Sequence, residues 1–129
     1  MATALKVLLE AEQDRADWPQ WLKDAQTRNA VVEIKNGKVI WKSGVWVNGI
    51  WNGGVWEDGT WQRGYWNDGI WEKGDWYDGT WRNGTWKGGT HHGGEWRGGT
   101  WEGGTWKGGT GQGLIGYRSF RKAVEKKPE

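Results

Sequence analysis

The side chains best suited to chemistry in this chain are two adjacent imidazoles, His91 and His92, and carboxylates scattered along its length. Histidines can bind a metal or move a proton, but neighbouring residues on a strand point to opposite faces, so this pair cannot bind one ion together. The sequence has no cysteine, no Ser-His-Asp pattern, no phosphate-binding loop and no carboxylates placed as an acid and base pair. We therefore expect no catalytic residues, no metal site and no cofactor, and we interpret the protein as a non-enzyme.

Tryptophan is the other notable side chain, with 15 copies in 129 residues beside 24 glycines. From residue 44 to 113 the chain repeats Gly-x-Trp-x-x in 14 consecutive pentapeptides, with His91 and Gly111 in place of two of the tryptophans. A period of five fits neither a helix nor a continuous strand, so a bend must restore the phase in every unit. Glycine, with Asn or Asp often before it, suits that bend. The pattern predicts a mainly β protein whose repeat, residues 44–113, is a β-solenoid with five-residue sides.

This repeat resembles the pentapeptide-repeat proteins, which wind as a right-handed four-sided β-helix of 20 residues per coil. The resemblance implies a bulky inward residue at the centre of each side and a small inward residue two places earlier. Trp takes the first role here and Gly the second, whereas the family uses Leu or Phe with Ala, Ser or Thr. The structural core is then predicted to consist of Trp46, Trp51, Trp56, Trp61, Trp66, Trp71, Trp76, Trp81, Trp86, Trp96, Trp101 and Trp106.

Coil length has two solutions. Four sides give about 3.5 coils and a stack of about 17 Å at the usual strand spacing. A three-sided coil of 15 residues places opposite charges over one another, such as Asp58 over Lys73, where the 20-residue coil places Asp58 over Asp78. Such exposed pairs contribute less than about 1 kcal/mol each, whereas crowding indoles into a three-sided core is a larger steric cost. We therefore expect four sides, with three sides as the alternative.

Three regions flank the repeat. Residues 1–30 contain no glycine and are predicted to be a helical cap or docking region, with Leu5, Leu8 and Leu9 on one stripe of a first helix. Asp17 with Gln20 three residues later indicates the start of a second helix. Residues 31–43 surround Asn-Gly and predict a β-hairpin leading into the solenoid. Residues 114–129 are predicted to be a C-terminal cap and basic tail.

Composition and flanks together favour a structural or adaptor protein that acts through self-assembly or protein contacts. A net charge of +2 argues against nucleic acid and anionic membranes as partners. The first residues do not form a signal peptide, so we expect a cytoplasmic protein. The open ends of a short solenoid expose unpaired backbone groups, so we also expect a homo-oligomer. The candidate interaction residues are Leu5, Leu8, Leu9, Trp18, Trp21, Arg118, Arg121 and Lys122.

Two further interpretations of the function remain. Stretches such as GVWVNGIWNGGVW resemble Trp-rich repeats in proteins of tailed bacteriophages, which implies a virion component. If the indoles faced outward, flat rows of tryptophan could stack on sugar rings, and the protein would be a carbohydrate-binding module with a glycan as its ligand. A dozen exposed indoles would be an aggregation hazard, so the buried arrangement is expected.

Overall fold

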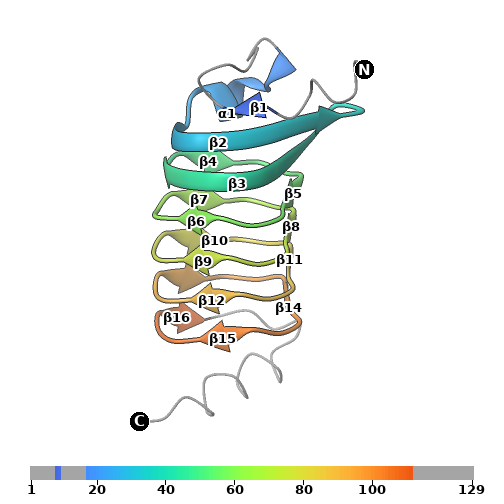
Figure 1. Ribbon diagram of the computed structural model, residues 1–129. Coiled ribbons are helices and arrows are strands. Elements are labelled where there is room, and N and C mark those ends of the chain that lie inside the picture. The colour runs from blue at the N-terminus through green and yellow to red at the C-terminus, as the bar shows by residue number, and fades with distance from the viewer. Residues whose placement is uncertain (1–7, 10–16, 112–129) are drawn as a thin grey trace.

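The computed structural model describes residues 8–9 and 17–111 of the chain, and these form a parallel β-solenoid whose coils stack along one axis (Figure 1). The N-terminal elements are β1 (Leu8–Leu9), α1 (Gln20–Lys23), β2 (Gln26–Lys35) and β3 (Lys38–Asn48). The coils continue in two-residue strands: β4 (Ile50–Trp51), β5 (Val55–Trp56), β6 (Thr60–Trp61), β7 (Tyr65–Trp66), β8 (Ile70–Trp71), β9 (Asp75–Trp76), β10 (Thr80–Trp81), β11 (Thr85–Trp86), β12 (Thr90–His91), β13 (Glu95–Trp96), β14 (Thr100–Trp101), β15 (Thr105–Trp106) and β16 (Thr110–Gly111).

The solenoid has three sides, and each coil contains 15 residues. Parallel strands pair residues 15 positions apart, as Trp56 with Trp71 and Trp66 with Trp81 show. Side 1 consists of the first part of β3 with β5, β8, β11 and β14; side 2 of the second part of β3 with β6, β9, β12 and β15; side 3 of β4, β7, β10, β13 and β16. The β-solenoid prediction is confirmed, the four-sided coil of 20 residues is wrong, and the 15-residue alternative is correct.

Indole shape explains why three sides suffice. Within one coil, adjacent tryptophans meet edge to face, as Trp66 and Trp71 do with ring centroids 5.8 Å apart at 72°. Between coils the rings stack almost parallel, as Trp56 and Trp71 do at 4.7 Å and 6°. Both arrangements are favoured by the ring quadrupole and exclude voids. Three flat rings therefore fill a triangular layer without the overpacking that bulk volume suggests.

Backbone hydrogen bonds and glycine corners join the coils. Ile70 donates its N–H to the carbonyl of Gly54 at 2.9 Å, Glu72 donates to Trp56 at 2.8 Å, and the other units repeat this pair. The corner glycines have positive φ, +125° at Gly69. A Cβ on Gly69 would lie 2.6 Å from the carbonyl oxygen of Gly54 in the preceding coil and 3.2 Å from the Nε1 atom of Trp51 in the core. The positive φ and the close approach of the preceding coil therefore require glycine at the corners, in addition to any role in filling the core.

Polar side chains fasten several of these corners. The Oδ1 atoms of Asp58, Asp68 and Asp78 each accept a hydrogen bond from the N–H of the glycine that follows, at 2.8 or 2.9 Å. Asn48 accepts the same bond from Gly49. Asn and Asp favour turns because their short side chains can bond the local backbone in this way. The turn residues recognised in the repeat therefore lie at its corners.

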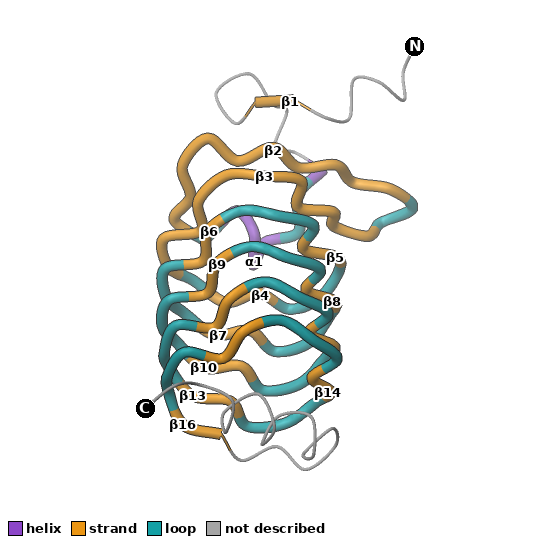
Figure 2. The backbone as a smooth tube through the Cα atoms, turned by 60° about the horizontal axis from the view of Figure 1, so that its bottom comes forward, coloured by secondary structure: helices purple, strands orange, loops and turns teal. Residues whose placement is uncertain are grey.

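A β-hairpin closes the N-terminal end of the stack. Strand β3 supplies the first rung of sides 1 and 2 through Trp41 and Trp46, and β2 pairs antiparallel with β3. Figure 2 shows the tip of this hairpin projecting beyond the coils. Asn36 and Gly37 form the tip with φ of +53° and +77°, the left-handed conformations that the Asn-Gly dipeptide favours. The hairpin spans residues 26–48, which is longer than the expected 31–43.

Helix α1 closes side 3, where the hairpin supplies no rung. The Trp21 ring lies 5.1 Å from the Trp51 ring at 66°, and Trp18 is buried nearby in the core. The helix begins after an N-cap at Pro19, which makes no side-chain capping bond. The predicted N-terminus with Asp17 as cap is therefore wrong, because the fixed φ of proline sets the entry to the helix.

Among its described residues, 8–9 and 17–30, the N-terminal region is less helical than the sequence predicts. Helix α1 is four residues long, and Leu8 and Leu9 form β1, which pairs antiparallel with β2. Strand β2 begins at Gln26 because pairing with β3 satisfies backbone groups that a helix would leave unpaired at the end of a sheet. The C-terminal region 114–129 lies outside the described residues. So do the candidate interaction residues Leu5, Arg118, Arg121 and Lys122.

Candidate interaction surfaces

All of the predicted core tryptophans lie inside the solenoid. Each of the following is at most 3% exposed: Trp46, Trp51, Trp56, Trp61, Trp66, Trp71, Trp76, Trp81, Trp86, Trp96, Trp101 and Trp106. Trp41 continues the row on side 1 and Trp18 lies in the cap, both buried. The exposed ladder that a carbohydrate-binding module requires is therefore missing, and Trp18 is not available at the surface for a partner.

The two histidines lie on opposite faces of the chain, as expected for neighbours on a strand. His91 ends β12 inside the core, whereas His92 lies outside with its Nε2 atom 3.1 Å from Asp75 Oδ1 and its ring stacked on Tyr77 at 4.3 Å. Within residues 8–9 and 17–111, no three metal-binding side chains gather. The exposed histidine belongs to a polar surface cluster, and the buried one belongs to the core.

His91 is the buried ionisable residue of the core. Its Nδ1 atom lies 3.1 Å from the Gly108 carbonyl oxygen, so the neutral ring donates its proton there, while Nε2 is buried without a hydrogen-bond partner. Burial among aromatic rings lowers the pKa of His91 to about 3, because the charged form would lose its hydration; the bond to Gly108 opposes this shift. His91 is therefore neutral at pH 7.

Outward side chains repeat along each side at coil spacing. Lys42 Nζ lies 2.9 Å from Glu57 Oε1 one coil later, and this hydrogen bond raises the pKa of Lys42. Asn67 donates from Nδ2 to Asn52 Oδ1 at 2.7 Å on side 3. Both pairs are open to solvent, so each contributes little to stability. They show that residues 15 apart are neighbours on the surface as well as in the core.

An exposed apolar pair stands on side 3 near the cap. Ile50 and Tyr65 are 48% and 47% exposed, and they are direct partners in the register of β4 and β7. A groove of about 280 Å³ beside them is also lined by Asp24 and Asn48. On the other flank, the Arg82 guanidinium lies 5.4 Å from the centre of the Tyr65 ring. We call Ile50 and Tyr65 the side 3 patch.

The sequence contained a signal for the side 3 patch that four-sided winding obscures. Ile50 and Tyr65 each precede a tryptophan and are 15 residues apart, so a 15-residue coil makes them neighbours. A 20-residue coil would instead place Ile50 beside Ile70, which the structure puts on side 1. The prediction of four sides therefore did not place Ile50 and Tyr65 next to each other.

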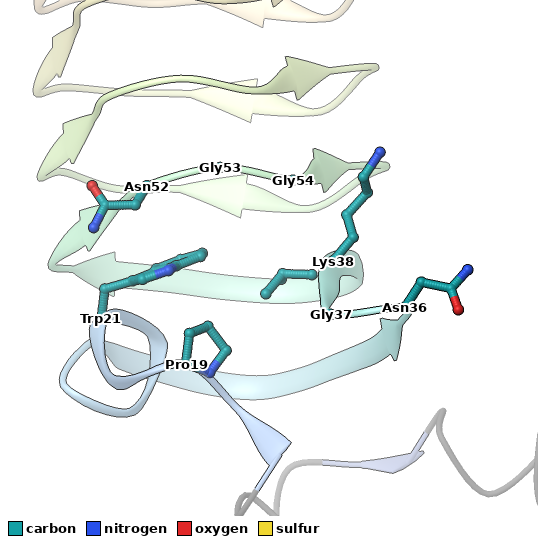
Figure 3. Close-up of a pocket in the computed structure, with 9 residues that line it drawn as sticks. Pro19, Trp21, Asn36, Gly37, Lys38, Asn52, Gly53 and Gly54 are labelled. Carbon is teal, nitrogen blue, oxygen red and sulfur yellow. The ribbon is translucent and has the colours of Figure 1, made fainter.

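A second groove lies where α1, the hairpin tip and the first coil meet (Figure 3). It measures about 350 Å³, and its lining includes Trp21, Pro19 and Asn52 with the backbone of Gly53 and Gly54. Trp21 is half-buried, while the other tryptophans are buried, so it is the single indole with appreciable access to solvent. Of the candidate interaction residues, Trp21 thus reaches both the core and the surface.

Photo-CIDNP NMR with a flavin dye should polarise one tryptophan and the exposed Tyr77, because the dye must touch a ring to transfer polarisation. The tryptophan signal should disappear in Trp21→Phe, which keeps an aromatic ring in the cap. Strong polarisation from several indoles in that variant would contradict the buried tryptophan core. Tyr77, which is 47% exposed, serves as the internal reference for dye access.

The described fold defines a three-sided parallel β-solenoid with a tryptophan core. No protein-family model, no curated protein and no solved structure matches the chain. The likeness to pentapeptide-repeat and bacteriophage proteins therefore rests on the repeat pattern alone. Among the described helices, none has the length and apolar character required to cross a bilayer.

Proposed function

We propose that this protein is a non-enzymatic structural or adaptor protein that acts through contacts between copies of its own chain. The observation that carries the proposal is the side 3 patch, an exposed isoleucine and tyrosine beside an arginine on a hydrogen-bonded sheet. Tyrosine and arginine are enriched among residues that dominate binding energy at interfaces. A surface held by coil stacking also loses little conformational entropy on association.

Charge on either flank of the patch favours a second copy as the partner. Along the solenoid axis, acidic Asp24 precedes Ile50 and Tyr65, and basic Arg82 follows them. A two-fold axis through the patch, perpendicular to the solenoid, would reverse this order in the partner. Arg82 of each copy would then face Asp24 of the other, which is the self-complementarity that an isologous dimer requires.

Sedimentation equilibrium of the full chain provides the test. We expect reversible dimerisation that Tyr65→Lys weakens at least about tenfold, because a buried aromatic contact is replaced by a charge. Tyr77→Lys is the matched control, since Tyr77 is equally exposed but lies after β9 on side 2. A monomer at every concentration, or equal weakening by both variants, would refute the proposed interface.

The charge pair can be tested separately. Asp24→Arg and Arg82→Asp should each weaken the dimer, since either places like charges opposite one another across the axis. The double variant restores opposite charges and should recover much of the lost affinity. A double variant whose defect equals the sum of the single defects would show that Asp24 and Arg82 do not meet across the interface.

A more specific role as a bacteriophage virion component belongs to the same proposal. It is supported by the resemblance of the Trp-rich repeat to repeats in proteins of tailed bacteriophages. A rigid body built from a short repeat, with contacts to identical copies, suits a structural part of a particle. The tryptophan rows that a glycan-binding surface would need lie in the core, so the structure does not favour the glycan-binding alternative.

A further inference from the structure

His91 interrupts the tryptophan row on side 2. Its ring stacks on Trp106 with centroids 4.0 Å apart, but the Trp76 ring on its other face is 5.9 Å away. Uninterrupted neighbours in the same row, such as Trp46 and Trp61, stack at 4.9 Å. The smaller imidazole thus moves towards the C-terminal coil and packs loosely against the coil before it.

The described residues around His91 provide neither a hydrogen-bond acceptor nor a negative charge for a second proton on the ring. The inward residues of the packed strands β9, β11, β13, β14 and β15 are all tryptophans. The ionisable side chains on or flanking these strands are at least partly solvent-exposed on the outer surface: Asp75, Tyr77, Lys87, Glu95, Arg97, Glu102 and Lys107. His92, the neighbour on its own strand, also lies outside, and its charge opposes protonation of His91. A proton on Nε2 would therefore be buried without an acceptor.

Aromatic faces offset only part of this cost. A cation over an indole face is stabilised, but by much less than the cost of burying an unpaired charge. The pKa of His91 is lowered to about 3, against about 6.5 for a solvated histidine. Below pH 6.5, His91 consequently binds a proton in an open form of this segment, whereas in the closed form it stays neutral until the pH approaches 3. Stability due to His91 is complete above pH 6.5 and is lost as the pH falls towards 3.

The position of His91 makes local opening the cheapest response. Among the described residues of its row, only Trp106 follows it, and the described strands end at β16. In a repeat protein each coil contacts only its neighbours, so separating residues 89–111 from the preceding coil disrupts a single interface between described coils. Opening from Gly89 onward would expose His91 and leave the coils nearer the cap intact.

We propose that His91 makes the C-terminal coils, residues 89–111, an acid-sensitive unit that opens while the remaining coils stay folded. In the closed state the neutral imidazole donates to Gly108 and stacks on Trp106, which holds the two coils together. Protonation at Nε2 favours the open state because the ion is then hydrated. This inference is independent of the proposed dimer, whose patch lies at the opposite end of the solenoid.

Hydrogen exchange followed by mass spectrometry on the full chain tests the inference between pH 7.5 and 4.5. After correction for intrinsic exchange rates, the open population of residues 89–111 should rise about tenfold per pH unit below 6.5. Residues 44–84 should keep their protection. His91→Trp, which restores the repeat, should abolish the rise, and His91→Phe provides a second uncharged ring if the larger indole does not fit.

His92→Gln is the matched control, because it removes the neighbouring exposed histidine and leaves the row unchanged. This variant should open in acid as the unaltered protein does. Unchanged protection of residues 89–111 down to pH 4.5 would overturn the inference. So would an acid response that persists in both His91 variants, or a loss of protection that spreads equally over residues 44–84.

Discussion

Replacing Gly69 by alanine should lower the free energy of unfolding by about 3–5 kcal/mol. Part of this loss, about 1–3 kcal/mol, comes from holding a residue with a Cβ at the φ of +125° that this corner requires. The remainder comes from the collision of the new methyl group with the Gly54 carbonyl, 2.6 Å away. That carbonyl accepts the hydrogen bond from Ile70, so relief of the clash weakens the contact between coils. Urea unfolding followed by far-UV circular dichroism measures the change.

Gly53→Ala is the control for this prediction. Gly53 also lies in a turn, but a Cβ there would meet nothing within 4 Å and its φ is not in the left-handed region. Alanine should therefore be neutral, or stabilise the protein slightly by restricting the unfolded chain. Equal losses in the two variants would mean that glycine is needed throughout the repeat for a reason other than corner geometry.

Trp71→Ala should lower the free energy of unfolding by at least about 4 kcal/mol. The indole is fully buried and stacks between Trp56 and Trp86, at 4.7 and 4.8 Å. Removing a buried Phe or Trp typically costs about 3–5 kcal/mol through lost burial and the remaining cavity. Each lost aromatic contact adds roughly 0.5–1.5 kcal/mol. Differential scanning calorimetry should therefore show a lower midpoint and a lower unfolding enthalpy.

The adjacent outward residue supplies the comparison for Trp71. Ile70→Thr changes the same strand on its solvent side, keeps a β-branched side chain and should cost less than about 1 kcal/mol. A Trp71→Ala protein as stable as Ile70→Thr would show that the core does not depend on continuous indole rows. The two variants together also test the inward and outward assignment along each two-residue strand.

The repeat period allowed the solenoid and its core to be predicted, but not the number of sides. The glycine and tryptophan spacing required one bend per five residues, and Trp71 and its equivalents could only be central to each side. Closure into three or four sides depends on how side chains pack in cross-section, which the period does not contain. Indole volume suggested four, whereas edge-to-face contacts such as that of Trp66 with Trp71 allow three. The stacking of charges, as between Lys42 and Glu57, was the better guide.

The cap and the candidate site depended on contacts that local patterns do not encode. The first half of strand β2, residues 26–30, forms where the sequence predicts helix, because the exposed edge of β3 selects a pairing partner. The sequence shows that Ile50 and Tyr65 are large apolar side chains, but only the correct coil length shows that they are neighbours. His91 was interpretable only as a lapse in the repeat. Only the structure shows that five indoles surround its ring and leave its Nε2 atom without a hydrogen-bond partner.

The tryptophan row on side 1 also has an optical consequence. Trp41, Trp56, Trp71, Trp86 and Trp101 follow one another without interruption, with ring centroids 4.7 to 5.1 Å apart and planes within 7° of parallel. Chromophores at such separations share excitation much faster than they emit light. Ultraviolet energy absorbed at any rung of this row therefore migrates along it, and the emitting indole need not be the one that absorbed. On side 2 the imidazole of His91 absorbs at shorter wavelengths than indole and interrupts the row. The sides of the solenoid therefore differ in how far excitation energy can move along them.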